Sequence, residues 1–211
     1  EQVIDITHEA GKPVSVDAAG QIYPLENFGK YVRMGADFQC IAAKYMGAPH
    51  STGFALGTKK MIDAISRHSF VGYEGRRVRG IGRPQKIDRQ EIVGVVAAVD
   101  RWLTLDHENR LSIAEGQSQE ILRPLQGIPG VTVSLNTNTK GHQPYGAFVN
   151  VDPDIVGFTN EDLVQKLRDG DPSIWTRVPE GETRLELHVF GLSDGQADLV
   201  GKAIAAAVKG G

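Results

Sequence analysis

The chain has 211 residues, of which 40% are hydrophobic and 23% are charged, and its formal net charge is -3. This balance excludes a disordered chain and a globally basic nucleic-acid-binding protein, because both depart strongly from it in hydrophobicity or charge. No run of about 18 uncharged apolar residues is present, so the sequence predicts no membrane-spanning helix. The pattern of a secretory signal is not recognisable, and the single cysteine, Cys40, cannot form an internal disulfide. We therefore expect a reducing, cytoplasmic compartment.

The first part of the chain alternates between helical patterns and short apolar strands. Apolar spacing predicts the end of a helix over 3–10 and a second helix over 25–34. Apolar and β-branched runs predict strands over 13–19, 37–43 and 53–57, and Thr58 is placed to cap a helix over 59–66. These alternating elements predict an α/β layer with strands buried on both faces.

Residues 67–89 differ from what precedes them, because they are rich in glycine and contain seven basic residues against two acidic ones. A segment of this composition is able to surround an anion. Mobile arginines in a solvated connector give the same composition, and charge runs usually lie on the surface. Both interpretations stay open from the sequence.

The remainder of the chain predicts an α+β domain. Asp88 and Glu91 form a capping-box pattern that opens a helix, which continues to Leu122 with a break near Asn109. Thr159 is placed to cap the helix that follows the middle strands. The predicted strands cover 131–135, 147–151, 174–178 and 184–190, and the later helices cover 161–168 and 196–209. We expect an antiparallel sheet with helices packed on it.

Two charged residues follow consecutive strands in the first part of the chain. Asp17 ends the first strand, and Lys44 comes directly after the second. Ligands of open α/β sheets bind at the carboxyl ends of strands, where a lysine that loses solvation can react as a neutral amine with a carbonyl. A pyridoxal cofactor also needs an acid beside its ring nitrogen. An ion pair, or two unrelated surface charges, would leave the same pattern.

Several motifs resemble the fold type I pyridoxal-phosphate-dependent enzymes, within them the group of selenocysteine synthase and D-glucosaminate-6-phosphate ammonia-lyase. The motifs cover nearly the whole chain: GKPVSVDAAGQ (11–21), GAD (35–37), KYMGAPHSTG (44–53), IGRPQK (81–86), EIVG (91–94), GDPSIWTR (170–177) and GLSDG (191–195). The resemblance implies an α/β fold in which 1–86 forms the later strands of the cofactor-binding large domain. It implies that 87–211 forms a small α+β domain with a long linking helix.

The resemblance assigns cofactor roles to residues of the first part. Lys44 matches the lysine that forms the Schiff base with pyridoxal 5'-phosphate, and Asp17 matches the partner of the pyridine nitrogen. Gln21 is a candidate contact of the cofactor ring, although a turn-stabilising amide would serve equally well. His50 and Ser51 follow the lysine in a turn that could face the cofactor phosphate, although ordinary turn chemistry would also place them there.

Arg83 and Arg177 are candidates for binding a substrate carboxylate or phosphate, since a guanidinium binds such groups with two parallel hydrogen bonds. A structural salt bridge is the alternative for each. The six histidines lack the spacing of metal ligands, so we expect no metal site. Cys40 lies within an apolar strand, where we expect a small core residue rather than a nucleophile.

The resemblance implies a lyase or transferase acting on an amino acid or amino-sugar acid, by α,β-elimination through an aldimine at Lys44. The alternatives are an aldolase, racemase or aminotransferase, and a non-catalytic subunit that keeps the fold. Members of the group carry a further segment before the matched region. We therefore expect the C-terminal piece of a longer polypeptide, or a chain completed by another one. The partners expected are a small amino substrate and further copies in a homo-oligomer, with neither membrane nor nucleic acid.

Overall fold

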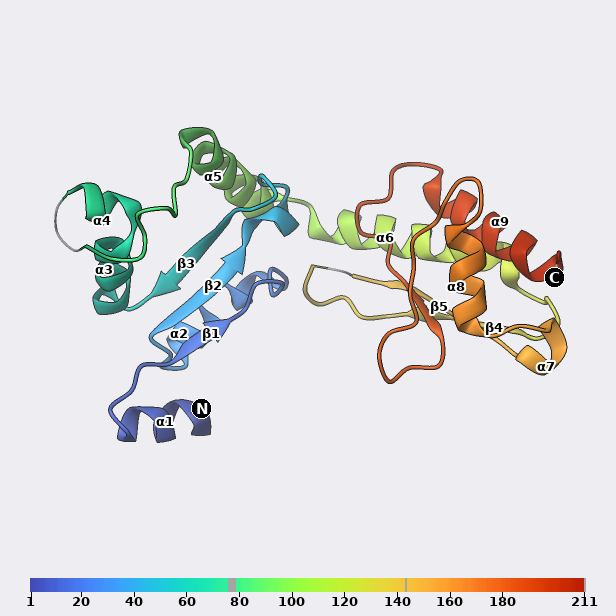
Figure 1. Cartoon of the computed structure of the whole chain (residues 1–211), viewed down its shortest axis with the longest axis horizontal. Coiled ribbons are helices and arrows are strands. Elements are labelled where there is room, and N and C mark those ends of the chain that lie inside the picture. Colours follow the sequence, from blue (N-terminus) through green and yellow to red (C-terminus); the bar gives the residue numbers. More distant parts are fainter. Residues whose placement is uncertain (76–78, 143, 211) are drawn as a thin grey trace. The chain divides into compact units, whose positions relative to one another are not determined.

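The computed structural model describes residues 1–75, 79–142 and 144–210 (Figure 1). The chain divides into two compact units, Glu1–Leu105 and Asp106–Gly211, which are described separately below. This division differs from the boundary after residue 86 that the sequence suggested. The helix α5 (Arg89–Thr104) packs with the first unit, because Trp102 belongs to its core and donates from Nε1 to the Ile22 carbonyl at 2.9 Å.

A three-stranded sheet organises the first unit. It consists of β1 (Ser15–Asp17), β2 (Phe38–Ala42) and β3 (Gly53–Gly57), in that order. β1 and β2 run parallel with Asp17 opposite Cys40, whereas β2 and β3 run antiparallel. The expectation that all strands are buried on both faces is wrong for this sheet, since β1 exposes two of its three residues. Within the described residues, β1 is an edge strand with one neighbour.

Short helices surround this sheet. They are α1 (Gln2–Glu9), η1 (Leu25–Asn27), α2 (Lys30–Arg33), η2 (Ala43–Met46), α3 (Lys59–His68) and α4 (Phe70–Glu74). The single helix predicted over 25–34 is split in two, because Gly29 between η1 and α2 adopts a φ of 72° that helical residues do not reach. The predicted cap of α3 is confirmed, since the Thr58 side chain accepts the Met61 N–H at 3.3 Å. The predicted capping box of Asp88 and Glu91 on α5 is also confirmed.

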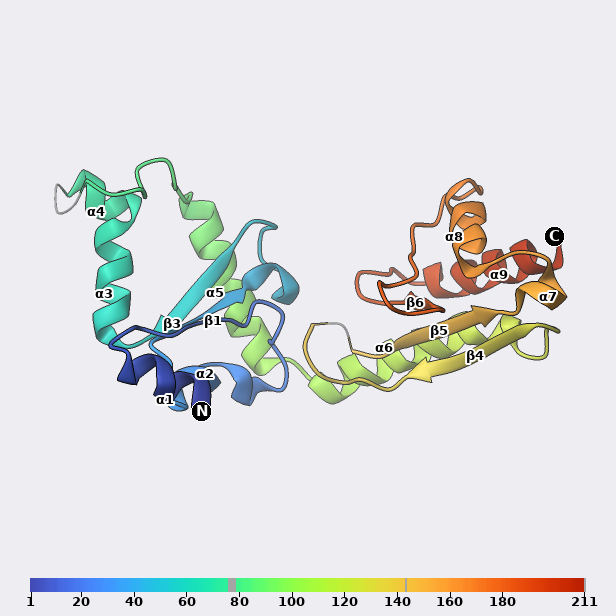
Figure 2. The same ribbon diagram turned by 60° about the horizontal axis from the view of Figure 1, so that its bottom comes forward.

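The second unit packs its helices onto one face of an antiparallel sheet. Its elements are α6 (His107–Leu122), η3 (Arg123–Leu125), β4 (Val131–Asn136), β5 (Gly146–Val151), α7 (Pro153–Val156), α8 (Asn160–Arg168), β6 (Leu185–Leu187) and α9 (Gln196–Lys209). The strand order is β4-β5-β6, with both pairs antiparallel as predicted. Figure 2 shows α8 and α9 on the same side of the β4–β5 pair. Alternate residues of β5 and β6 form the core with these helices and α6.

Two predictions for the second unit are corrected by the structure. Residues 174–178 form no strand, because the described backbone there makes no ladder with β6 and bonds only through the Ile174 N–H, to the Leu167 carbonyl at 2.8 Å. The helix break falls at Leu105–Asp106 rather than near Asn109, since the Asp106 carboxylate accepts the Asn109 N–H at 2.9 Å and starts α6. In the part of the chain that the structure describes, no helix is long and apolar enough to cross a membrane.

Candidate functional site

Asp17 stands at the carboxyl end of β1 with one carboxylate oxygen engaged. Its Oδ1 accepts the Ala19 N–H at 3.0 Å and lies 3.5 Å from the Cys40 thiol sulfur, which can donate to it. Oδ2 has no hydrogen-bond partner among the described residues. The carboxylate is therefore oriented through one oxygen, while the other is able to accept a further donor.

Lys44 lies in η2, directly after the carboxyl end of β2. Because β1 and β2 are parallel and paired, Lys44 and Asp17 follow neighbouring strands at the same edge of the sheet. The side chain is half-buried, and its Nζ lies 5.1 Å from the centre of the Tyr45 ring. Within residues 1–75 and the other described ranges, Lys44 forms no ion pair. Its amine is held over an aromatic face instead of being paired with a carboxylate.

Gln21 lies in the turn after β1 and is engaged by a tyrosine. Its Oε1 accepts the Tyr31 hydroxyl at 2.7 Å, and its backbone N–H bonds the Ala18 carbonyl at 2.9 Å. These bonds are the ones that the turn-stabilising interpretation expects. They leave the side-chain amide nitrogen as the group that could approach a ligand.

His50 and Ser51 are exposed in the turn between η2 and β3. The turn is fixed on both sides of them, because the Thr52 hydroxyl donates to the Pro49 carbonyl at 2.6 Å. Helix α5 also packs against it at Gly94, where an added Cβ would lie 2.7 Å from Pro49 Cδ. A side chain at position 94 would therefore displace the turn that carries His50 and Ser51.

Arg83 is engaged within its own segment. Its guanidinium lies 5.5 Å from the Phe70 ring and 5.4 Å from the Tyr73 ring, and its Nε is 3.6 Å from Glu74 Oε1. The contact with Glu74 is the structural salt bridge that was the alternative for Arg83. The two ring contacts are with the same helix, α4. The neighbouring arginines Arg76 and Arg77, part of the basic segment predicted to surround an anion or to be solvated, lie outside the described residues.

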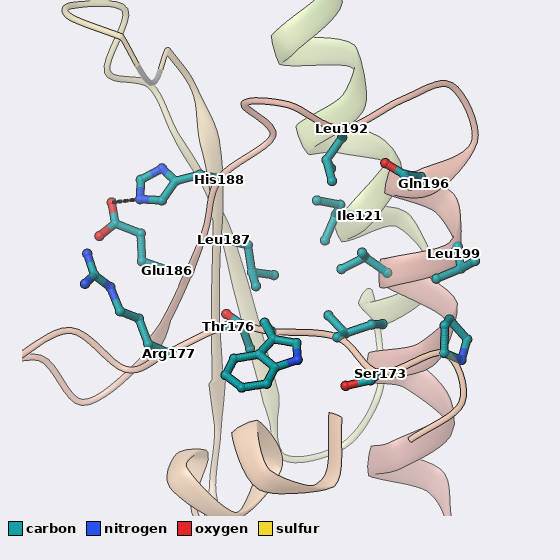
Figure 3. Close-up of a pocket in the computed structure, with 14 residues that line it drawn as sticks. Ile121, Ser173, Thr176, Arg177, Glu186, Leu187, His188, Leu192, Gln196 and Leu199 are labelled. Atoms are coloured by element: carbon teal, nitrogen blue, oxygen red, sulfur yellow. Dashed lines mark ion pairs between the residues drawn. The ribbon is translucent and has the colours of Figure 1, made fainter. Parts of the chain in front are cut away.

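Arg177 lies in the second unit beside a cavity of about 630 Å³, formed by residues 172–177, β6, α6 and α9. Figure 3 shows the Arg177 side chain on the same side of β6 as Glu186 and His188, while Leu187 points to the opposite side. Among the described residues the Arg177 guanidinium has no ion pair or hydrogen bond. Arg177 therefore has the free donors that binding of an anion requires.

Sequence reasoning did not single out Cys40 as a contact of Asp17, or Glu186 and His188 as neighbours of Arg177. The sequence did contain a signal for the latter two. Residues 184–190 were predicted as a strand, and alternate residues of a strand share a face, so Glu186 and His188 had to lie together. The contact of Cys40 depends on the register of β1 and β2, which the sequence does not specify. Across the described residues, no group of three or more His, Cys, Asp or Glu is suited to holding a metal ion.

The chain matches no protein-family model, but it is similar to two characterised proteins. A 5'-C-glycyluridine monooxygenase-decarboxylase from Streptomyces sp is 28% identical over 178 residues, which cover 84% of this chain and 41% of that protein. A D-glucosaminate-6-phosphate ammonia lyase from Salmonella typhimurium is 27% identical over 166 residues, which cover 78% of this chain and 40% of that protein.

Solved structures show the same arrangement of elements. The structure of D-glucosaminate-6-phosphate ammonia-lyase matches with a TM-score of 0.69 and 20% identity, over 98% of this chain and 52% of that one. An alpha-aminoadipate aminotransferase from Thermus thermophilus, complexed with N-(5'-phosphopyridoxyl)-L-leucine, matches with a TM-score of 0.51 and 11% identity, over 99% of this chain and 53% of that one. The fold is that of the fold type I pyridoxal-phosphate enzymes. The predicted fold class is thereby confirmed, and the chain spans about half of a fold type I chain.

Proposed function

We propose that this chain is part of a pyridoxal-phosphate-dependent lyase or transferase of the fold type I class. The observation that carries the proposal is the placement of Asp17 at the carboxyl end of β1 and of Lys44 just after the paired parallel strand β2, at one edge of the sheet. The two similar proteins and the fold support it. A non-catalytic subunit would have no need of both an oriented carboxylate and an unpaired amine at this edge.

The residues at this edge suit the cofactor. Asp17 Oδ2 is free to accept a hydrogen bond from a protonated ring nitrogen, while its other oxygen is fixed by Ala19 and Cys40. The Lys44 amine is half-buried and has no acidic partner in the described ranges, so it is available to react with an aldehyde. Gln21, His50 and Ser51 are proposed as further contacts of the cofactor.

The chemistry follows from the positions of these side chains. When bound, pyridoxal phosphate supplies a carbonyl for the amine and a ring that accepts electrons from the substrate. The Asp17 carboxylate would hold the proton on the ring nitrogen, because an ion pair favours the charged form of both groups. The Lys44 amine, freed when the substrate amine takes its place on the carbonyl, would remove the proton from the substrate Cα as general base. A β-hydroxyl group would leave with that proton as water, and uptake of one water by the eliminated product would give a 2-oxo acid and ammonia.

The substrate is proposed to be an amino acid or amino-sugar acid. Arg177 would bind its carboxylate or phosphate, because its guanidinium is free in the described structure. Arg83 is a second candidate for an anionic group, although it would first have to leave Glu74. One of the similar proteins is named as acting on D-glucosaminate 6-phosphate, which is an amino-sugar acid and fits this proposal.

The partners are proposed from apolar surface in the first unit. Val3 and Ile6 of α1 are 71% and 66% exposed, and Val93 and Val96 of α5 are 67% and 64% exposed. Exposed apolar side chains grouped on helices usually mark a surface that further protein covers. We propose that further polypeptide of the same enzyme, and a second copy in a homo-oligomer, cover these helices. The lone thiol of Cys40 favours a cytoplasmic location.

Reduction with borohydride tests the assignment of Lys44. We expect pyridoxal phosphate followed by borohydride to add one pyridoxyl group, which peptide mass mapping places on Lys44. Lys44→Ala should lose this group, and the matched variant Lys12→Ala, which removes an exposed lysine, should keep it. Labelling that is spread over surface lysines, or that survives Lys44→Ala, would overturn the proposal.

The products distinguish the possible reactions. Incubation of the native protein with a panel of D- and L-hydroxy amino acids should release ammonia and a 2-oxo acid if elimination occurs. An aldehyde with glycine would indicate aldol cleavage, the opposite enantiomer would indicate racemisation, and an amino group passed to an added 2-oxo acid would indicate transamination. Any of these three results would contradict elimination while keeping Lys44 as the reactive amine.

A further inference from the structure

A group of polar side chains lies on the face of β6 that is turned away from the helices. Leu185 and Leu187 of β6 are buried in the core of the second unit, while Glu186 and His188, the residue directly after the strand, project to the other face. Figure 3 shows Arg177 on this same side, below Glu186. A guanidinium, a carboxylate and an imidazole therefore lie on one side of β6, and their residues are among those that line the cavity.

Glu186 is oriented by its neighbours through one oxygen. Its Oε1 accepts the Asn136 side-chain N–H at 3.1 Å and lies 3.8 Å from His188 Nε2. The side chains of Glu186 and His188 are only 26% and 25% exposed, so both are held in partly desolvated positions. Oε2 has no partner among the described residues. The Glu186 carboxylate is thus held in place through Oε1, while Oε2 is able to accept a hydrogen bond from a ligand.

Two further atoms beside the cavity lack partners. Thr176 Oγ1 and His188 Nδ1 are buried from solvent and form no hydrogen bond within the described part of the chain. Buried polar atoms are rarely left unpaired, because the desolvation cost is then not recovered. On the side of β6 that carries Glu186, a ligand hydroxyl would supply a partner to His188 Nδ1, whereas an apolar ligand would leave it unpaired.

We propose that Glu186 determines the substrate class at this site by accepting a hydrogen bond from a substrate hydroxyl. The substrate is a polyhydroxylated carboxylic acid: its carboxylate binds Arg177, and a hydroxyl further along its chain binds Glu186 Oε2. Asn136 is a positioning residue that fixes the Glu186 carboxylate. This assignment rests on the proposed role of Arg177 as the anion-binding residue. It adds a second recognised group of the substrate, the hydroxyl that Glu186 binds.

Carboxylates of matched length test this assignment on the full chain. D-gluconate carries hydroxyls on every carbon after the carboxylate, and hexanoate has the same carbon number without them. Dissociation constants are measured from chemical-shift titrations of the ¹⁵N-labelled protein. We expect Glu186→Ala to weaken gluconate binding at least about tenfold, as for loss of a hydrogen bond to a charged group, and to leave hexanoate binding unchanged.

Further variants separate recognition from structural effects. Arg177→Ala should weaken both acids, because both carry the carboxylate. Glu108→Gln, which changes an exposed glutamate at the start of α6, should weaken neither. If Glu186→Ala proves unfolded by circular dichroism, Glu186→Gln keeps the shape and the bond from Asn136 and should still weaken gluconate selectively.

Three results would overturn the assignment: no binding of gluconate by the unaltered chain, equal weakening of both acids by the Glu186 variants, or no weakening of either. Equal weakening would mean that Glu186 serves only to organise the charges around Arg177. The borohydride experiment labels Lys44, which belongs to the other unit, so a negative result there would contradict the cofactor proposal alone. The gluconate titrations would still decide the role of Glu186.

Discussion

At the scale of single residues, the Asp37 carboxylate connects three segments of the first unit. Its Oδ2 accepts the Val14 backbone N–H at 2.9 Å and lies 2.8 Å from His8 Nε2. The hydrogen bond from Val14, and then the one from His8, hold the pKa of Asp37 below its usual value, although partial burial opposes them. The residue before β1, Val14, is thereby connected to the end of α1 and to the start of β2.

This lowered pKa makes a pH-dependent contribution to stability. A carboxylate with a depressed pKa in the folded state stabilises the fold above its unfolded-state pKa of about 3.9, and loses that effect as the pH falls through the folded-state value. We expect Asp37→Asn to lower the free energy of unfolding by about 1 kcal/mol at pH 7, and by progressively less below pH about 4. Urea unfolding across this pH range measures the difference, and a constant difference would contradict the role of the charge.

At the scale of elements, Trp102 connects α5 to the first unit. Its ring is 4% exposed, and its Nε1 donates to the Ile22 carbonyl over a distance of 2.9 Å. The bond joins residues 80 positions apart in the chain, in a buried setting. A helix that the sequence attached to the C-terminal domain is thereby anchored to the turn that follows β1.

Trp102→Phe should therefore destabilise the chain. It removes the donor and leaves the buried Ile22 carbonyl without it, and such losses cost about 1–3 kcal/mol. Trp175→Phe is the matched control, because Trp175 is 75% exposed, and surface changes usually stay within about 0.5 kcal/mol. Thermal and denaturant unfolding of both variants make the comparison. Equal effects would show that the buried hydrogen bond does not hold α5 in place.

Local signals predicted most elements, and long-range contacts account for the errors. Thr58, Asp88 and Thr159 act as the predicted caps because a cap is satisfied within three residues of itself. The strand predicted over 174–178 is absent, because a strand needs a neighbouring strand that shares its backbone hydrogen bonds, and residues 174–178 pair with none of the described strands. The unit to which α5 belongs depends on Trp102 meeting Ile22, a pairing that no local pattern encodes.

The part of the candidate site that lies at the ends of strands was predictable from the sequence. Asp17 and Lys44 occupy predicted positions because parallel neighbours bring their carboxyl ends to one edge. The cluster of Arg177, Glu186 and His188 could be assembled only with the structure. Its members come from a loop and a strand whose adjacency the sequence does not state.

At the scale of the whole molecule, the two units differ in how their apolar cores are organised. Among the residues that the structure describes, the second unit contains one cluster of 16 buried apolar residues, whereas the first has two clusters of 7 and 3. One continuous core buries more apolar surface than small separate ones of the same chain length. The second unit is therefore the better equipped to be stable alone.

We expect a fragment of residues 106–211 to fold cooperatively by itself and a fragment of residues 1–105 not to do so. Circular dichroism on heating and the dispersion of amide proton signals measure this. A sharp thermal transition for the second fragment, together with a gradual one for the first, is the expected result. Cooperative unfolding of fragment 1–105 would mean that its small clusters suffice without further protein.

The close approach of Gly94 to Pro49 has a consequence for how this protein can evolve. Position 94 tolerates no added carbon without movement of the turn that carries His50 and Ser51. A change at this one position of α5 would alter the geometry of a loop that is distant in sequence but in contact with the helix. An engineer who wished to reshape that loop, without touching its own sequence, would begin with substitutions of increasing size at residue 94.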